Sequence, residues 1–162
     1  MKRSFIIIAI FVSTFFLSPG ASAQSVGFGV HGGGVGITGT ANGGIGYGAH
    51  LIAQPFSLAG FKVDATFADL DGGRFFSTSP SFILFPVDFL ELKMGFLGGA
   101  TLVKFGTGAD LEFGLNFGAL GELGITDNFR VGMEAKYHSV FETEDFWTVF
   151  LTTTYHFELG AW

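Results

Sequence analysis

The chain of 162 residues has no cysteine, few charged residues and an excess of acidic over basic side chains. Without cysteine, neither a disulfide framework nor a thiolate zinc site can form. Charged residues make up 14% of the chain, whereas a soluble globular domain averages about 25%. Eight Lys and Arg stand against fourteen Asp and Glu. This balance excludes the basic surface that is typical of nucleic-acid binding.

Glycine and phenylalanine are abundant instead, with 26 Gly and 22 Phe. The aromatic content argues against disorder. After residue 23 the apolar residues are scattered among glycines, and no stretch reaches 18 consecutive apolar residues. A membrane-spanning helix is therefore not expected in that part of the chain.

Residues 1–23 have the pattern of a secretory signal peptide. The basic pair Lys2-Arg3 precedes an apolar run over 5–17, and Ala-Ser-Ala at 21–23 fits the small-x-small rule of signal peptidase. The apolar run is shorter than the roughly 20 residues that a spanning helix needs. We expect cleavage after residue 23 and one exported domain over 24–162.

From residue 24 onward the apolar residues recur with period two. In the longest segment Phe113, Leu115 and Phe117 alternate with Gly114 and Asn116, which predicts a strand with one apolar and one small or polar face. Eight such segments are separated by turn-like residues. They are 26–31, 45–51, 61–67, 82–87, 92–96, 111–119, 129–137 and 147–157. The phase of 82–87 stays open, because apolar residues occupy both of its faces.

The composition of the two faces decides which one points inward. The apolar set is rich in Phe, Tyr, Trp, Met and Leu, which are too bulky for a lumen that eight strands leave just wide enough for side chains. We therefore predict an all-β fold: an eight-stranded antiparallel up-and-down transmembrane β-barrel, with a polar, side-chain-filled lumen. A soluble lipid-binding barrel, apolar inside and wet outside, is the alternative.

Loops and interface aromatics follow from this topology. The loops expected at the outer side are 37–43, 69–79, 99–108 and 139–146; two of them would expose aromatics, at 74–76 and 141–146. Aromatics expected at the periplasmic rim are Phe56, Phe89, Phe129, Tyr155 and Phe157. Those expected at the outer rim are Phe67, Tyr137, Phe141 and Trp147.

Nine charged residues fall on the inward face. They are Lys62, Asp64, Glu91, Lys93, Glu112, Glu122, Arg130, Glu134 and Lys136. Charges in a narrow lumen must pair, so we expect a structural network that closes the barrel. A wide porin is excluded because it needs about sixteen strands. A narrow pore, gated by exchange of ion-pair partners, is the alternative.

The four histidines also face inward. We expect His31 and His138 towards the outer rim and His50 and His156 nearer the periplasmic end, so that they do not converge. No metal site and no cofactor are predicted.

The best candidate for nucleophilic catalysis is His138 with Ser139 and an acid at Glu142 or Glu144. A serine nucleophile needs its base within hydrogen-bond reach, but adjacent residues of a strand point to opposite faces. No catalytic residue is predicted.

The C-terminal region resembles a known family. Residues 118–137 place Phe129 after a tight Thr-Asp-Asn turn at 126–128, and the chain approaches its end with Tyr155-His156-Phe157. This is similar to the penultimate hairpin and C-terminal strand of OmpA/OmpX-like small barrels of the Gram-negative outer membrane. That family ends on an aromatic assembly signal, whereas here five residues follow Phe157. The resemblance implies a signal at Tyr155 and Phe157, or at Trp162 in a shifted register.

The resemblance also implies a location and partners. These are the bacterial outer membrane, its lipid and lipopolysaccharide, the outer-membrane assembly machinery and periplasmic chaperones, with no nucleic acid and no identified surface ligand. We expect a non-catalytic structural or surface-interaction role. The alternatives are a narrow pore or hydrophobic small-molecule conduit and, less favoured, a lipid A-modifying enzyme. Lipid A deacylases separate the histidine and serine by one residue, which this sequence does not.

Overall fold

The computed structural model describes residues 24–71, 73–89, 91–106 and 108–159. The signal peptide expected over 1–23 lies outside the described residues. The strands are β1 (Gln24–Ile37), β2 (Gly43–Phe56), β3 (Ala59–Leu70), β4 (Gly73–Phe89), β5 (Leu92–Phe105), β6 (Glu112–Gly124), β7 (Phe129–Val140) and β8 (Phe146–Leu159). In the described part of the chain, no helix has the length and apolarity needed to cross a bilayer.

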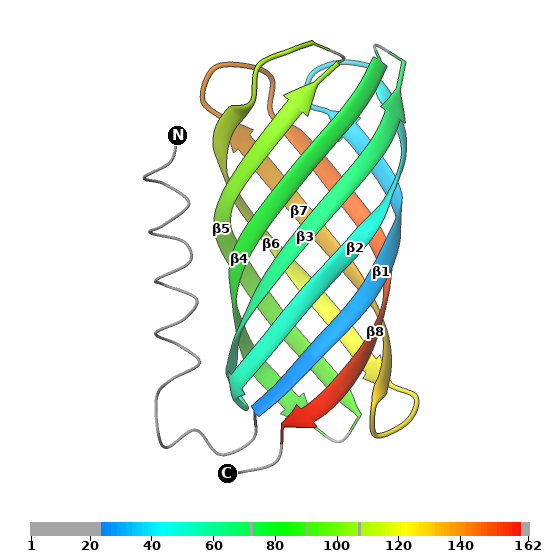
Figure 1. Ribbon diagram of the computed structural model, residues 1–162, viewed down its shortest axis with the longest axis vertical. Coiled ribbons are helices and arrows are strands. Elements are labelled where there is room, and N and C mark those ends of the chain that lie inside the picture. The colour runs from blue at the N-terminus through cyan, green and yellow to red at the C-terminus, as the bar shows by residue number, and fades with distance from the viewer. Residues whose placement is uncertain (1–23, 72, 90, 107, 160–162) are drawn as a thin grey trace.

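The eight strands form one closed antiparallel barrel, as predicted. Each strand pairs with its neighbour in the sequence, and β1 pairs with β8 from Gln24↔Leu159 to Ile37↔Phe146. The strands are tilted against the long axis of the barrel (Figure 1). Closure leaves no strand edge with unpaired backbone groups, which is the condition for a sheet to sit in lipid.

Two irregularities in strand register coincide with prolines. The β2–β3 pairing shifts between Ala53 and Phe56, a stretch that contains Pro55. The β4–β5 pairing shifts between Leu84 and Val87, a stretch that contains Pro86. Proline has no N–H to donate to the ladder, so it is tolerated where the pairing is already interrupted.

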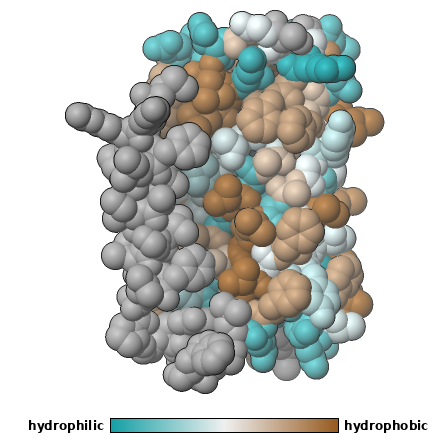
Figure 2. All heavy atoms as spheres, viewed as in Figure 1, coloured by the Kyte–Doolittle hydropathy of each residue, from teal (hydrophilic) through white to brown (hydrophobic). Residues whose placement is uncertain are grey.

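The bulky apolar side chains point outward. On β6, Phe113, Leu115 and Phe117 are between 49% and 60% exposed, whereas Gly114 and Asn116 are buried. In the coloured part of Figure 2, hydrophobic residues gather in the middle of the face, and hydrophilic ones gather towards its two ends. This arrangement matches the lipid-facing assignment and is the reverse of a soluble barrel.

The two ends of the barrel differ in their connections. The start of β1 and the end of β8 lie at one end, together with the connections β2–β3, β4–β5 and β6–β7 (Figure 1). We call this the termini end. The opposite end, the loop end, carries the β1–β2, β3–β4, β5–β6 and β7–β8 connections, among them the longest ones. Outer-membrane barrels keep their short turns on the periplasmic side.

Two of the expected loops are wrong. Strand β4 already begins at Gly73, and β5 continues to Phe105, so most of 69–79 and 99–108 is strand. Within 73–81, the inward side of β4 carries Ser77, Ser79 and Ser81 in addition to Phe75. A run of small polar residues resembles a loop in sequence, although here it fills the lumen side of a strand.

The lumen is also less polar than predicted, because aromatic side chains enter it. Phe75 and Phe146 were expected in exposed loops, yet they are 2% and 0% exposed and pack edge to face, with ring centroids 5.0 Å apart. They belong to a cluster at the loop end, the outer plug. Its members are Val35, Ala68, Phe75, Val103, Val140, Phe146 and Phe150. A Cβ at Gly33 would lie 3.0 Å from the Phe150 ring and one at Gly46 would lie 3.2 Å from it, so these two glycines leave room for that ring.

A second apolar cluster occupies the half of the lumen nearer the termini end. Its members are Ile52, Ile83, Phe85, Leu97 and Leu120. Ile83 and Phe85 are fully buried, while Phe82 and Leu84 face outward. This settles the phase of residues 82–87.

Candidate functional site

Four charged side chains meet in the middle of the lumen. Lys62 and Asp64 come from β3, and Glu134 and Lys136 come from β7, on the far side of the barrel. Residues two apart on a strand share a face, so each strand presents one acid and one base inward. We call these four residues the central charge network.

Every member of the network contacts two members of opposite charge. Lys62 Nζ lies 3.0 Å from Asp64 Oδ1, and Lys136 Nζ lies 2.9 Å from Glu134 Oε1. Lys62 also donates to Glu134 across the lumen, and Lys136 donates to Asp64. All four side chains are at most 6% exposed. Full pairing is what allows the four charges to be buried.

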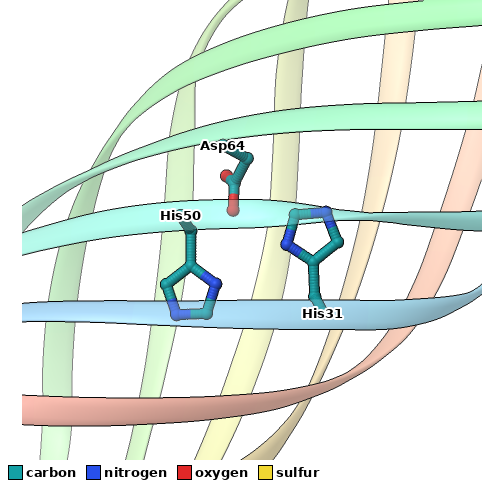
Figure 3. Close-up of side chains that lie close together, drawn as sticks. All are labelled: His31, His50 and Asp64. Atoms are coloured by element: carbon teal, nitrogen blue, oxygen red, sulfur yellow. The ribbon is translucent and has the colours of Figure 1, made fainter.

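Two histidines lie beside this network, contrary to the expected separation of His31 from His50. Their rings are stacked with centroids 5.8 Å apart. His50 stands directly opposite Asp64 in the β2–β3 ladder, and the three side chains converge from three consecutive strands (Figure 3). His31 Nε2 bonds to Thr66 Oγ1 and His50 Nε2 bonds to Thr154 Oγ1, each at 2.9 Å.

A chain of polar side chains continues from the network towards the loop end. Ser79 Oγ lies 2.8 Å from Thr101 Oγ1, which lies 2.7 Å from His138 Nδ1. The His138 ring stacks on Phe146 at 4.1 Å, directly under the outer plug. Ser139 points to the opposite face, as alternation requires. His138 and Ser139 therefore do not form a nucleophile and base pair.

Towards the termini end the inward charges are less well paired. Glu122 and His156 are buried, and Glu122 Oε2, Arg130 Nη1 and His156 Nε2 have no hydrogen-bond partner among the described residues. Lys93 pairs with Asp88 at 3.4 Å near the rim. Buried polar atoms without protein partners are typically hydrated, although the second apolar cluster fills part of this half of the lumen.

The two remaining charged candidates lie at the rims. Glu91 is exposed in the turn between β4 and β5, and its carbonyl accepts a hydrogen bond from the Gly124 N–H. Glu112 begins β6 at the loop end and accepts a hydrogen bond from Thr143 Oγ1. The structure does not bring either of them into the central charge network.

The outward aromatics at the end of β8 are in contact. Tyr155 and Phe157 pack at 4.9 Å in a T-shaped arrangement on the outer face of β8. The Asn128 side chain donates to the Tyr155 hydroxyl at 3.4 Å. Trp162, the other candidate for the assembly signal, lies outside the described residues.

The β7–β8 loop is fixed by one carboxylate. Asp145 accepts hydrogen bonds from the Tyr137 hydroxyl at 2.7 Å and from the Val140 N–H at 2.9 Å. The Tyr137 bond, followed by the Val140 bond, holds the pKa of Asp145 below its ordinary value. The Asp145 carbonyl accepts from Thr38 N–H at 2.9 Å, which ties this loop to the β1–β2 turn.

A closed eight-stranded antiparallel barrel with an apolar outer surface and charges paired inside is the fold of the small outer-membrane barrels. Solved structures with this fold are similar to the chain. The N-terminal β-barrel domain of Pseudomonas aeruginosa OprF matches with a TM-score of 0.66 and 15% identity, over 84% of this chain and 100% of that one. Neisserial surface protein A matches with a TM-score of 0.59 and 14% identity, over 86% and 99%.

The attachment invasion locus protein Ail of Yersinia pestis matches with a TM-score of 0.55 and 16% identity, over 85% of this chain and 100% of that one. No protein-family model matches the chain, and no curated protein sequence is significantly similar to it. At these identities the comparisons show the fold: an outer-membrane-type β-barrel.

Proposed function

We propose that the protein is a non-catalytic barrel of the bacterial outer membrane with a closed lumen and a structural or surface-interaction role. The observation that carries the proposal is the central charge network, in which two strands on opposite sides of the barrel are joined by ion pairs. The outer plug lies between this network and the loop end and is made of buried apolar side chains. A continuous aqueous path would have to pass both.

The short loops at the loop end favour a compact surface rather than the long extended loops of an adhesin. Its connections are short, the β7–β8 loop is fixed by Asp145, and Phe141 at its start packs on Phe113 with centroids 5.6 Å apart. Lipopolysaccharide is the partner we propose for this rim. The outward Tyr155 and Phe157 are the residues we propose the assembly machinery reads.

The closed lumen predicts the absence of ion conductance. Purified mature protein, inserted into planar bilayers in concentrated KCl, is expected to give no unitary current steps, because ions cannot cross both the network and the plug. An open porin inserted in the same bilayers serves as the positive control. Reproducible steps from the folded protein would replace this proposal with the narrow gated pore.

Export predicts a processed N-terminus and outer-membrane fractionation. The expressed protein should begin at Gln24 by mass spectrometry, and its unboiled form should migrate differently from its boiled form on gels. Ala23→Arg should block processing because signal peptidase requires a small residue there. Ser22→Arg, at the unrestricted position, is the matched control. An unprocessed or periplasmic wild-type protein would contradict the localisation.

A further inference from the structure

We propose that His31, His50 and Asp64 form a binding site for a borderline first-row divalent cation, of which Cu²⁺ and Zn²⁺ are the best candidates. One ligand atom from each residue lies within 4.8 Å of the other two. All three side chains are buried in the middle of the barrel. Its members come from the three consecutive strands β1, β2 and β3, so pairing of these strands assembles the site.

Two of the three atoms that would bind the ion have no other partner. His31 Nδ1 and His50 Nδ1 have no hydrogen-bond partner among the described residues, whereas Asp64 Oδ1 is paired with the Lys62 ammonium group. Two unpaired imidazole nitrogens in one buried cluster are unusual, because buried polar atoms are nearly always paired. In Figure 3 the Asp64 carboxylate and one nitrogen of each ring face the same gap.

The other ring nitrogens are held as they are in metal sites. Each Nε2 is hydrogen-bonded to a threonine hydroxyl: His31 Nε2 to that of Thr66, and His50 Nε2 to that of Thr154. A histidine that donates from Nε2 carries its lone pair on Nδ1, which is the metal-binding atom in that tautomer. The His31 ring is further held by stacking on Phe150, with centroids 4.7 Å apart.

A glycine lies opposite each of the two histidines in the β1–β2 ladder. In the β1–β2 ladder His31 stands across from Gly48, and His50 stands across from Gly29. A Cβ at Gly48 would come within 2.7 Å of His31 Nε2, and one at Gly29 within 2.5 Å of His50 Nε2. These two glycines therefore leave the space that both imidazole rings occupy.

The charge balance permits a cation despite two nearby lysines. Lys62 Nζ lies 3.0 Å from Asp64 Oδ1, so the ion would share that oxygen with an ammonium group. The central charge network as a whole is neutral, because Glu134 and Asp64 offset both lysines. An imidazole and carboxylate donor set selects Cu²⁺ and Zn²⁺ over Mg²⁺. Donors of a tetrahedral site lie about 3.4 Å apart, so small side-chain rotations must tighten the cluster.

Both halves of the lumen hold an apolar cluster, the outer plug at the loop end and the second cluster nearer the termini end. The half nearer the termini end also holds polar atoms of Glu122, Arg130 and His156 that have no hydrogen-bond partner among the described residues. A cation that approaches from this end would pass these polar groups as well as the second cluster.

The experiment uses tag-free, folded, EDTA-stripped protein in detergent, titrated separately with Cu²⁺, Zn²⁺ and Mg²⁺ by calorimetry. Wild type is expected to bind one equivalent of Cu²⁺ or Zn²⁺ and no Mg²⁺. His31→Gln and His50→Gln are each expected to weaken binding by at least about tenfold, the smallest loss seen for removing even an outer-shell partner. His156→Gln removes a buried histidine outside the cluster and should bind like wild type.

The electron paramagnetic resonance spectrum of the Cu²⁺-loaded wild type decides the ligands without any variant. It should show hyperfine splitting from two imidazole nitrogens. The background is low because the chain has no cysteine and all four histidines are buried. The absence of stoichiometric binding, a spectrum with oxygen ligands only, or equal weakening by His156→Gln would each overturn the site.

Discussion

Asp64→Asn is expected to destabilise the barrel by about 3–5 kcal/mol, the cost of breaking a buried ion pair on one side only. Asp64 accepts a hydrogen bond from Lys136 and lies 3.0 Å from Lys62. Its replacement leaves two buried ammonium groups with Glu134 as their one remaining carboxylate in the network. The amide keeps the shape of the side chain, so the loss reports charge rather than volume. Urea unfolding in lipid vesicles, followed by tryptophan fluorescence, measures it.

The matched control is the ion pair at the rim. Asp88 lies 3.4 Å from Lys93, and its side chain is 27% exposed. Asp88→Asn should cost no more than about 1 kcal/mol, because water replaces the lost partner. If Asp64→Asn cost as little as Asp88→Asn, the network would not be a buried structural element.

A double variant tests how much of the stability lost in Asp64→Asn comes from the ammonium group that it leaves unpaired. Lys136→Met removes one of the ammonium groups that Asp64→Asn leaves unpaired. The double variant should therefore be more stable than the sum of the two single losses predicts, by about 0.5–3 kcal/mol of coupling. Strict additivity would show that Asp64 and Lys136 do not interact in the folded barrel.

Alternation made the strand count, the antiparallel closure and the outward apolar face predictable. Alternation also predicts that four charged side chains face inward, because in a period of two the face opposite the lipid is the lumen face. They are those of Lys62, Asp64, Glu134 and Lys136. The sequence does not show which of the charged residues contact one another. That depends on the height of each residue along its strand and therefore on the shear of the barrel.

The sequence does not predict the aromatic side chains inside the lumen, for a related reason. Phe75 and Phe146 stand next to Phe76 and Trp147, which face outward, so the sequence shows aromatics on both faces and no phase. The predicted exclusion of bulky side chains from the lumen holds only where every strand contributes a bulky inward residue. Opposing residues such as Gly33 and Ser77 are small, and a Cβ at Gly33 would come within 3.0 Å of the Phe150 ring. The lumen therefore admits rings where its other walls recede.

The meeting of His31 and His50 had a signal that the sequence does carry. The two residues lie at nearly equal distances before and after the turn over 38–42, so a tight hairpin must bring them to the same height. The ladder pairs them two residues apart, each facing a glycine. The predicted segments 26–31 and 45–51 stop short of the strand ends, and within those bounds the two histidines fall near opposite ends of the barrel.

Leu151→Arg is expected to cost about 2–4 kcal/mol, because an arginine on the lipid face at the bilayer midplane must be buried in hydrocarbon. Leu151 is 67% exposed on β8 and pairs with Gly32, while its neighbour Thr152 pairs with His31. It therefore lies on the outer face at the height of the central charge network, near the middle of the barrel.

The control for depth is Phe56→Arg, which places the same charge on the last residue of β2 at the termini end. There the arginine reaches the interface, and the cost should be no more than about 1 kcal/mol. Both variants are unfolded by urea in the same vesicles, so the difference between them measures depth rather than helix or strand preference. A soluble barrel would tolerate both substitutions within about 0.5 kcal/mol, since each adds a charge to a wet surface. Equal and small costs would therefore refute the membrane-spanning assignment, whereas a cost confined to Leu151→Arg follows only if lipid surrounds the middle of the barrel.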